Sequence, residues 1–446
     1  MGELKEKFKA LNGRQITRAE IINMMLYATI LIMPLIVVKV SVRRYSLGKL
    51  MFLYVVGIFL LINIFKDFFK GKKIRIKKEY VVLIIFLLSI LIVSILSPYR
   101  MTAIFGNNIR NEGFLTICIY LILFFASCEY LKITEKSLDI ILLIGSLHGV
   151  YGIFQFYNID PIQKWILEEI TTNHSYGLLG NRNFFSAYIV LFLVLALGRY
   201  ILKGGTKNLI FSIILFSALI CSLTRSGWLS ILVVGVFGIL FIIKRKECIK
   251  RALIILLVFV LSIFVLNVTS NGSVFGRVQH TRDEINLISE KDMNTEDSKN
   301  IASSINSRNE ITKIYLKAFF DSPFLGTGPD TFNNRLMDDY TDELLEILLK
   351  TGEGADKAHN EYLEYATSCG IFTLISYLVL LGMIIWGLIK NIKDDKNKII
   401  LLTILGYMIQ AFFNISVIGV APLFWILLGY AVKVIYEYKE SERDII

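Results

Sequence analysis

The chain has 446 residues, 55% of them hydrophobic, and it carries a formal net charge of +11. Its mean hydropathy of +0.60 is too high for a soluble protein of this length, which excludes the soluble enzymes. The positive charge is scattered through short segments beside apolar runs, which favours anchoring against anionic lipid over nucleic-acid binding.

Apolar runs of about 17 to 21 residues recur along the sequence, long enough at 1.5 Å per residue to cross a hydrocarbon core of roughly 30 Å. They lack the two-residue alternation of barrel strands, so the spans are expected to be helices. We predict an all-α polytopic membrane protein with about twelve transmembrane helices. The predicted spans are residues 21–41, 49–65, 80–97, 113–130, 138–158, 184–202, 207–222, 227–243, 252–268, 371–389, 399–416 and 418–437.

The distribution of Lys and Arg orients these spans. With the N-terminus inside, 29 of the 48 Lys and Arg residues fall in the inner segments, and the dense cluster from Lys66 to Lys78 is among them. Positive residues are enriched in cytoplasmic loops, so we expect both termini in the cytoplasm. The first span has no small-residue cleavage site, and we expect it to be retained.

One long outer segment interrupts the alternation of spans and short loops. Residues 269–370 hold 18 acidic and 10 basic residues in an otherwise cationic chain. The polar stretch Glu290 to Ser304 predicts a flexible loop. The pattern from Ser307 to Phe320 predicts an amphipathic helix on the membrane face, with Ser307 as its N-cap. The segment is therefore expected to form a helical extracytoplasmic cap.

This pattern divides the chain into three parts. Residues 1–268 are expected to form an N-terminal membrane domain with about nine transmembrane helices. Residues 269–370 are expected to form the extracytoplasmic loop domain, and residues 371–446 a C-terminal membrane domain with about three transmembrane helices.

Two polar residues stand out as candidates for chemistry. Arg225, in LTRSGW, lies outside in the predicted topology, against the positive-inside trend. It is either an interfacial arginine reaching lipid headgroups or a bidentate ligand for a phosphate or diphosphate. His359, in AHNEYLE, is either a surface histidine that caps a helix or a base that removes a proton from an attacking hydroxyl.

Further outer-facing residues could line the same site. Arg308 opens the expected amphipathic helix, and it is either a solvated charge or a second cation beside Arg225. Asn181, Arg182 and Asn183 precede a predicted span, where they form either a plain turn or part of a polar, cationic cleft.

Other polar positions carry weaker signals. His148 lies inside a predicted span, where a polar group suggests function and a packing contact between helices is the alternative. Arg110 and Glu112 lie in the outer loop before the fourth span. No metal site is expected, because HNEYLE lacks the HExxH spacing and the five cysteines lack CxxC spacing.

Together these motifs resemble those of the O-antigen ligase superfamily, which includes lipopolysaccharide O-antigen ligases, Wzy-type polymerases and some protein O-oligosaccharyltransferases. The resemblance covers most of the chain and rests on the order and placement of short motifs. These motifs are GNRNFFSAY from Gly180, LTRSGW around Arg225, SRNEI at Arg308, SPFLGTGPDTF from Ser322 and AHNEYLE around His359.

The resemblance implies glycosyl transfer, without a metal or other cofactor, from an undecaprenyl-diphosphate-linked glycan to an acceptor hydroxyl outside a bacterial plasma membrane. His359 would activate the acceptor, while Arg225 and Arg308 would hold the departing diphosphate. One direct displacement would invert the anomeric configuration. Relatives often carry proline where GNRN has Arg182, so the role of this residue is open. Substrate-binding roles are expected for Asn181, Arg182, Asn183, Gly326, Gly328, Asn360 and Tyr362.

Alternatives remain at the level of function. A ligase and a Wzy-type repeat-unit polymerase share the donor and differ in the acceptor, which could be a glycolipid, a glycan or a protein. A lipid-linked glycan flippase or exporter would also have many spans, but transporters place polar residues and broken helices at mid-membrane. Here the candidates gather at the outer face. The expected partners are donor, acceptor and membrane lipids, without nucleic acid.

Overall fold

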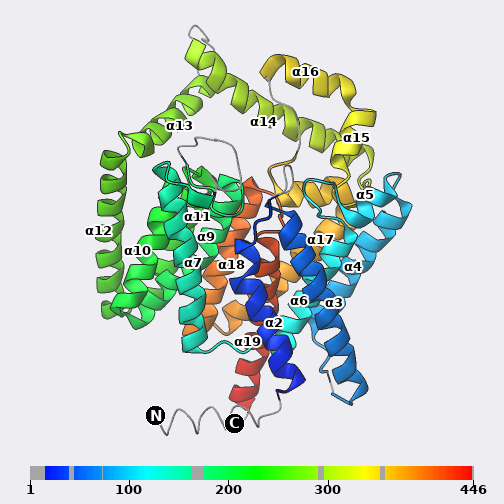
Figure 1. Ribbon diagram of the computed structural model, residues 1–446, viewed down its shortest axis with the longest axis vertical. Coiled ribbons are helices and arrows are strands. Elements are labelled where there is room, and N and C mark those ends of the chain that lie inside the picture. The colour runs from blue at the N-terminus through cyan, green and yellow to red at the C-terminus, as the bar shows by residue number, and fades with distance from the viewer. Residues whose placement is uncertain are drawn as a thin grey trace.

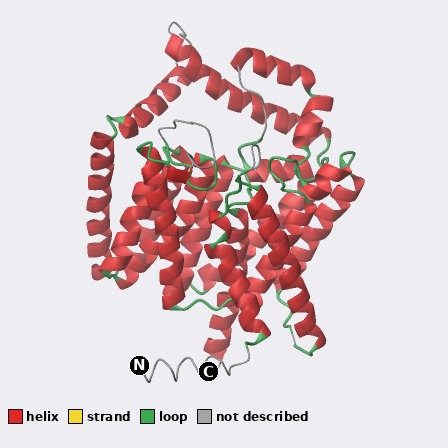
Figure 2. Ribbon diagram, viewed as in Figure 1, coloured by secondary structure: helices red, strands yellow, loops and turns green. Residues whose placement is uncertain are grey.

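The computed structural model describes residues 16–39, 45–72, 74–162, 174–289, 296–351 and 357–443. These residues form helices and connections without a strand (Figure 2), which confirms the predicted all-α class. Long helices lie side by side in a bundle, and a smaller group of helices arches over one end of it (Figure 1). The first described helix begins, and the last one ends, at the opposite end of the bundle.

The bundle contains two stretches of chain separated by the arch, which we call the cap. The first stretch comprises α2 (Arg18–Leu31), the 3-10 helix η1 (Met33–Leu35), α3 (Leu47–Phe69), α4 (Lys78–Leu96), α5 (Arg100–Phe105), α6 (Phe114–Tyr130), α7 (Glu135–Phe156), α9 (Arg182–Lys203), α10 (Thr206–Cys221), α11 (Arg225–Ile242) and α12 (Lys246–Thr269). The cap comprises α13 (Ser273–Ser289), α14 (Glu296–Asp321), α15 (Phe332–Asp339) and α16 (Thr341–Thr351). The second stretch comprises α17 (Glu361–Lys390), α18 (Asp395–Phe413) and α19 (Ala421–Arg443).

Many of these helices have the length and composition of membrane spans. Within the described ranges, eight helices are long and apolar enough to cross a membrane, and α6 and α10 are shorter apolar helices. The 23 residues of α3 extend about 35 Å, slightly more than a hydrocarbon core of roughly 30 Å. The chain is therefore a membrane protein built from several apolar helices.

One predicted span has a different limit in the structure, and another is confirmed. The first was expected over residues 21–41, but α2 ends at Leu31, because Pro34 has no amide hydrogen and lies in the short η1 helix. The tenth was expected over residues 371–389, and it agrees with the second piece of α17. The backbone of α17 is non-helical at Gly370, so a separate helical piece that begins at Glu361 meets the span there at a kink.

Side-chain caps fix the starts of several helices. Thr17 and Glu20 form a reciprocal capping box at α2. The side chains of Asn181, Asn360 and Asp394 accept hydrogen bonds from backbone amides in the first turns of α9, α17 and α18. These bonds satisfy amide groups that have no partner inside the helix.

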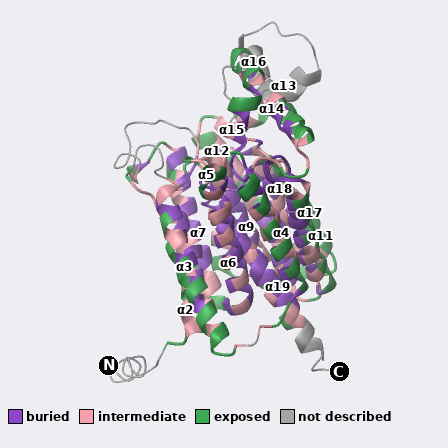
Figure 3. Cartoon of the chain, turned by 90° about the vertical axis from the view of Figure 1, so that its right-hand side faces the viewer, coloured by how far each residue is buried: buried purple, intermediate pink, exposed green. Residues whose placement is uncertain are grey.

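Burial separates central from peripheral helices (Figure 3). In the 18-residue apolar stretch of α9, 72% of the residues are buried inside the protein, whereas in the corresponding stretch of α12 only 11% are buried. Leu256 and Leu257 of α12 are among its exposed apolar side chains. Apolar surface of this kind is suited to contact with lipid, so α12 lies at the edge of the bundle and α9 in its interior.

The cap has its own apolar core, which corrects the predicted place of the amphipathic helix. Ile314 and Tyr315 of α14 are buried, and the rings of Tyr315 and Phe332 stack with centroids 3.6 Å apart. Leu336 and Ile347 join the same cluster from α15 and α16. The apolar face of α14 thus packs inside the cap and does not lie on the membrane surface.

The start of α14 was also predicted wrongly. The helix begins at Glu296, so Ser307 lies inside it and is not its N-cap, and residues 296–304 are helical where a loop was expected. Propagating an existing helix by one residue requires little additional order. Helix elongation from the packed part therefore outweighs the low helix propensities of Ser and Asn.

The helices α6 and α19 approach each other closely at Gly429. A Cβ atom added to Gly429 would lie 2.1 Å from the carbonyl oxygen of Phe124. One turn away, the hydroxyl of Ser127 donates to the carbonyl oxygen of Ile426 at 2.7 Å. Only a glycine permits this separation of the two backbones.

We expect Gly429→Ala to destabilise the protein by about 1 to 3 kcal/mol, the typical cost of overpacking, because the new methyl group has no space. Thermal unfolding in detergent would measure the change. The matched control is Gly382→Ala in α17, where an added Cβ meets nothing within 4 Å. Equal melting temperatures for the two variants would contradict the close packing of α6 against α19.

Candidate functional site

The ends of four bundle helices are joined beneath the cap. Ser226 of α11 donates to the side-chain oxygen of Gln410 at 3.0 Å, and the amide nitrogen of Gln410 donates to Ser186 of α9 at 3.1 Å. The Tyr362 hydroxyl of α17 donates to the carbonyl oxygen of Met408 at 3.1 Å. Because Met408 and Gln410 are two residues apart near the end of α18, these bonds attach the starts of α9, α11 and α17 to the same end of that helix.

Arg225 lies at this place as the first residue of α11. The chain enters α11 through a sharp turn in which Leu223 has a φ of 50°. The Thr224 hydroxyl donates to the carbonyl oxygen of Arg182 at 3.3 Å, and Nη1 of Arg225 donates to the Thr281 hydroxyl of α13 at 3.5 Å. The helix N-terminus adds its own positive potential to that of the guanidinium, a combination that attracts anions.

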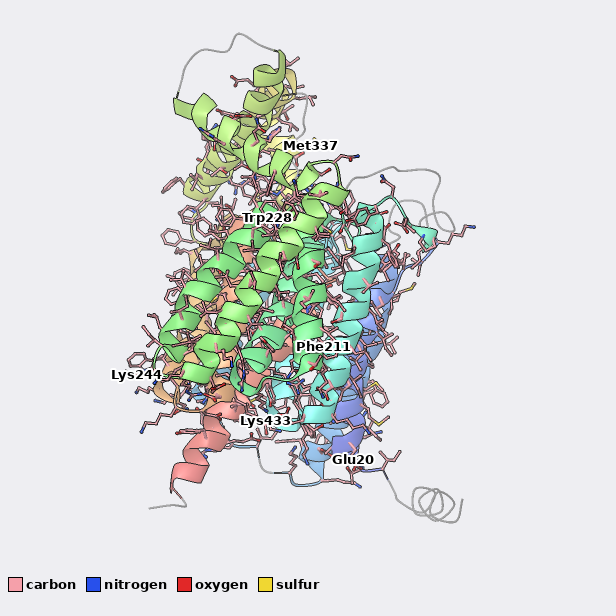
Figure 4. All side chains as sticks on the ribbon, turned by 90° about the vertical axis from the view of Figure 1, so that its left-hand side faces the viewer. Glu20, Phe211, Trp228, Lys244, Met337 and Lys433 are labelled. Carbon is pink, nitrogen blue, oxygen red and sulfur yellow. The ribbon has the colours of Figure 1, made fainter. Side chains whose placement is uncertain are left out.

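More cations surround Arg225 from both the bundle and the cap. Burial lowers the pKa of His174, and the charges of Arg182 and Arg277 lower it further. Arg277 belongs to α13, the first helix of the cap. Figure 4 shows the labelled Trp228, three residues after Arg225, near the cap end of the bundle, with Lys244 at the opposite end. This side of the site is therefore rich in positive charge.

His359 lies in a turn with an unusual backbone. Its φ is 49°, in the left-handed region that costs a non-glycine residue roughly 1 to 2 kcal/mol. The preceding Ala358 is buried in the core of the cap. The side chain of Asn360 accepts hydrogen bonds from the amides of Tyr362 and Leu363, both at 3.0 Å. The turn is thus fixed on both sides, by the cap and by α17, and strain of this kind is often found at functional sites.

Left-handed non-glycine residues are concentrated at this end of the molecule. All those found within the described ranges lie in connections on the cap side of the bundle or inside the cap. They are Asn111, Asn158, Leu223, Asn271, Asp330 and His359.

A buried ion-pair network lies close to the His359 turn. Arg110 pairs with Asp330 at 3.4 Å and with Glu364 at 3.2 Å. Glu361, also in the first turn of α17, accepts hydrogen bonds from Tyr377 at 2.8 Å and from a second tyrosine, Tyr407, at 3.2 Å. Glu361 and Glu364 lie two and five residues after His359, at the start of α17. This network therefore anchors the end of the turn that leads into α17.

Asp330 and Glu112 connect the network to further loops. The second carboxylate oxygen of Asp330 accepts from the amides of Asn107 at 2.7 Å and Glu112 at 3.1 Å. The Glu112 carboxylate accepts from the hydroxyls of Tyr120 at 2.7 Å and Ser416 at 3.2 Å. Burial raises the pKa of Asp330, against the opposing charge of Arg110. Burial also raises the pKa of Glu112 to about 8.

A cavity of about 230 Å³ opens beside this network. Arg110 and Asn107 line it from the α5–α6 loop, Asn333 from α15 and Lys357 from the segment just before His359. Aromatic and aliphatic side chains complete the wall. Its lining combines cationic, amide and apolar groups, which suits a polar substrate with an apolar part.

The structure brings most of the predicted site residues to this end of the bundle. Asn181 caps α9 and accepts from the Asn183 amide at 2.8 Å, and Arg182 follows in the first turn. Arg308 lies within α14, but its side chain is outside the described part of the structure. His148 makes a packing contact, because its Nε2 accepts from the Leu178 amide at 2.8 Å.

The two glycines of SPFLGTGPDTF, Gly326 and Gly328, lie in a turn that packs against α17. The amides of Thr327 and Gly328 donate to the carbonyl oxygen of Ser368 at 3.1 and 2.8 Å. A Cβ atom on Gly326 would lie 2.4 Å from the same oxygen. The turn therefore rests on α17 beside its kink at Gly370, and contact of either glycine with substrate stays a prediction.

The sequence reasoning missed Asp330, Glu361 and Glu364, although their motifs had been singled out. The available signal was the pair of carboxylates three residues apart at the start of a helix, which places both on one face. Arg277 was also missed in the run GRVQHTR. Among the described residues, no group of three or more His, Cys, Asp or Glu side chains could hold a metal ion.

An apolar helical bundle with polar and charged residues gathered under a cap defines a membrane protein with its candidate site at one end of the helices. Residues 210–378 match the family model described as O-antigen ligase, a stretch that contains Arg225, Arg308 and His359. This match confirms the resemblance stated above. The match indicates the glycan-transferring ligase and polymerase class of membrane proteins. No curated protein matched the chain.

Glu112→Gln tests the buried carboxyl. Because the pKa of Glu112 is raised from its ordinary value of 4.5 to about 8, the folded protein keeps a proton that the unfolded chain releases in this window. Its contribution to stability is complete below pH 4.5 and falls as the pH rises toward 8, by at most about 1.4 kcal/mol per pH unit. Glutamine stays neutral, so the variant should gain stability relative to wild type between pH 5 and pH 8, as measured by thermal unfolding. Parallel pH profiles would contradict the raised pKa.

Proposed function

We propose that this chain is a glycosyltransferase of the O-antigen ligase type that moves a glycan from an undecaprenyl-diphosphate donor to an acceptor hydroxyl. The acceptor could be a glycolipid, as in a ligase, a growing glycan, as in a Wzy-type polymerase, or a protein. We further propose that the twelve predicted spans all cross a bacterial plasma membrane. In this topology both termini are cytoplasmic, and the cap formed by residues 269–370 lies outside.

One observation carries the proposal: a guanidinium at a helix N-terminus and an imidazole on a strained turn are tied to the same end of α18. Ser226, next to Arg225, is bonded to Gln410, and Tyr362, close to His359, is bonded to Met408. A cation cluster and a titratable base at the same end of the bundle match the needs of a reaction with an anionic leaving group and a hydroxyl nucleophile.

The proposed reaction is a single displacement. The imidazole of His359 takes the proton from the acceptor hydroxyl while the hydroxyl oxygen forms a bond to the anomeric carbon of the donor. The bond from that carbon to the diphosphate oxygen breaks, and the lipid diphosphate leaves with both electrons of the bond. Arg225 and Arg308 stabilise the departing charge. Attack opposite the leaving group inverts the anomeric centre, and the proton on His359 later passes to solvent.

The side chains identified around these residues receive supporting roles in this proposal. Arg182 and Arg277 extend the positive surface for the diphosphate. Asn181, Asn183, Asn360, Tyr362, Gly326 and Gly328 contribute to substrate binding directly or through the shape of the turns that they form. The cavity lined by Arg110, Asn107 and Lys357 is proposed to receive the acceptor.

A flippase or exporter is the proposal from another class. The kink of α17 at Gly370 is a feature that such a protein would share, because transporters often break helices at their substrate site. The backbone at the kink is already occupied, since the Ile371 amide donates to the carbonyl oxygen of Pro323 at 2.8 Å. The kink is therefore bonded to the turn at Pro323, and we favour an enzyme over a transporter.

His359→Asn and His359→Ala should both abolish transfer, with a loss of roughly 100-fold to 10,000-fold, the usual contribution of a general base. Asparagine tolerates the left-handed backbone of this position, so its failure would reflect lost proton transfer and not a disturbed turn. The measurement compares surface glycans and lipid-linked intermediates in a deletion strain complemented with each variant, with membrane protein levels as the control.

The outcome in that strain also separates the proposed functions. Long glycan left on the lipid carrier outside the membrane indicates a ligase, and single repeat units in place of a ladder indicate a polymerase. Precursors on the inner face, or a wild-type pattern with His359→Asn, would rule out the catalytic role of His359 and favour transport.

Arg225→Lys should impair transfer almost as much as Arg225→Ala, because an ammonium cannot form the two parallel hydrogen bonds that a guanidinium offers to a diphosphate. Rates of transfer in membrane vesicles with a defined lipid-linked donor would measure this. Full activity of the lysine variant would instead identify Arg225 as an interfacial anchor, for which any cation suffices.

A further inference from the structure

A second cavity lies in the half of the bundle remote from the cap. Its volume is about 160 Å³, and helices α2, α7, α9, α18 and α19 contribute to its wall. Most of the lining side chains are aliphatic, including Leu138, Leu191, Leu195, Ile399 and Leu427. None of the residues assigned to the candidate functional site lines this cavity, so any role that it has is separate from the proposed chemistry.

The depth of the cavity corresponds to one leaflet of a bilayer. On α9 its lining runs from Leu191 to Lys203, and the twelve steps between these residues extend about 18 Å along the helix axis. Half of a hydrocarbon core of roughly 30 Å is about 15 Å. The apolar part of the wall therefore has the length of an acyl chain that reaches from the headgroup level to the middle of the membrane.

Charged residues surround the mouth of the cavity. Arg199 pairs with Glu135 at 2.9 Å and with Asp139 at 2.6 Å, and Lys203 pairs with Glu135 at 2.5 Å. Lys396, at the start of α18, lines the mouth, and among the described side chains it forms no ion pair. An exposed ammonium at headgroup level is placed to meet an anion.

The mouth as a whole carries more positive than negative charge. Lys207 pairs with Asp139, and Arg245 and Lys398 pair with Asp395 at 2.8 and 2.6 Å. Of the charged side chains that line the cavity, three are cationic, Arg199, Lys203 and Lys396, and two are carboxylates, Glu135 and Asp395. Such an excess favours a ligand with a negative headgroup.

We infer that this cavity holds one acyl chain of an anionic phosphoglycerolipid whose phosphate lies beside Lys396. Apolar cavities bind water poorly, because water needs polar partners that a wall of aliphatic side chains lacks. An acyl chain would bury its surface against Leu195 of α9 and Ile399 of α18, two helices that also pack directly on each other, and in this way it would stabilise the bundle. The lipid is thus a structural partner and not a substrate.

Native mass spectrometry of the full chain, with dioleoylphosphatidylglycerol as the added lipid, tests the inference. Wild type should retain one tightly bound lipid after delipidation. Leu195→Trp and Ile399→Trp each fill the cavity from one wall, and both should lose this lipid while the protein stays folded by circular dichroism. Leu257→Trp on the exposed face of α12 is the matched control and should keep it. Retention of the lipid by both cavity variants would overturn the proposal.

The headgroup is tested by the same measurement. Lys396→Gln removes one positive charge, and phosphatidylglycerol should bind about fivefold more weakly, the usual effect of one cation near a charged membrane surface. Dioleoylphosphatidylethanolamine, which has no net charge, should bind wild type and Lys396→Gln equally and more weakly. Equal affinity of wild type for the two lipids would contradict the anionic site. Glycan transfer is not part of either readout, so failure here would leave the proposed enzymatic function unaffected.

Discussion

The buried pairs of Arg110 with Asp330 and Glu364 are the interaction on which the cap side of this protein depends. Arg110 belongs to the loop between α5 and α6, Asp330 to the turn before α15, and Glu364 to the start of α17. These segments are far apart in sequence. Removing one member would leave a buried charge without its partner, which typically costs 3 to 5 kcal/mol. The network therefore fixes the relative position of the cap and the bundle.

The same network determines what surrounds the His359 turn. Carboxylates lie on the side of Arg110, whereas Arg182, Arg225 and Arg277 gather on the side of α11 and α13. The site is thus polarised, with negative groups held in ion pairs on one side and cations on the other. A ligand that carries a diphosphate at one end has a preferred direction in such a field.

The sequence predicted those parts of the fold that depend on local composition. Apolar runs long enough to cross a membrane led to helices close to their observed positions. The caps at Asn181 and Asn360 were not predicted, since Asn181 was interpreted as part of a turn and His359 was the capping residue considered for the later helix. One span limit failed at Pro34, where the helix ends because proline has no amide hydrogen, a local feature that a hydropathy pattern does not encode.

The site was predicted less completely, for a physical reason. Arg225 and His359 stood out because each is unusual for its surroundings in the sequence. Asp330 and Glu364 are ordinary in theirs, and they become notable only because folding places them against Arg110. The beginning of α14 was missed because helix propagation from a packed segment outweighs the preference of Ser and Asn for turns.

The left-handed residues on the cap side also bear on how the protein responds to stress. Asn and Asp tolerate this backbone with little cost, but Leu223 and His359 do not, and both lie in turns that border the candidate site. Their strained backbone conformations persist only while the contacts with α18, the core of the cap and the Arg110 network remain in place. Local opening of the molecule should therefore begin at these turns, before the helices of the bundle separate. Heat or detergent would then inactivate the protein while most of its helical content is still intact.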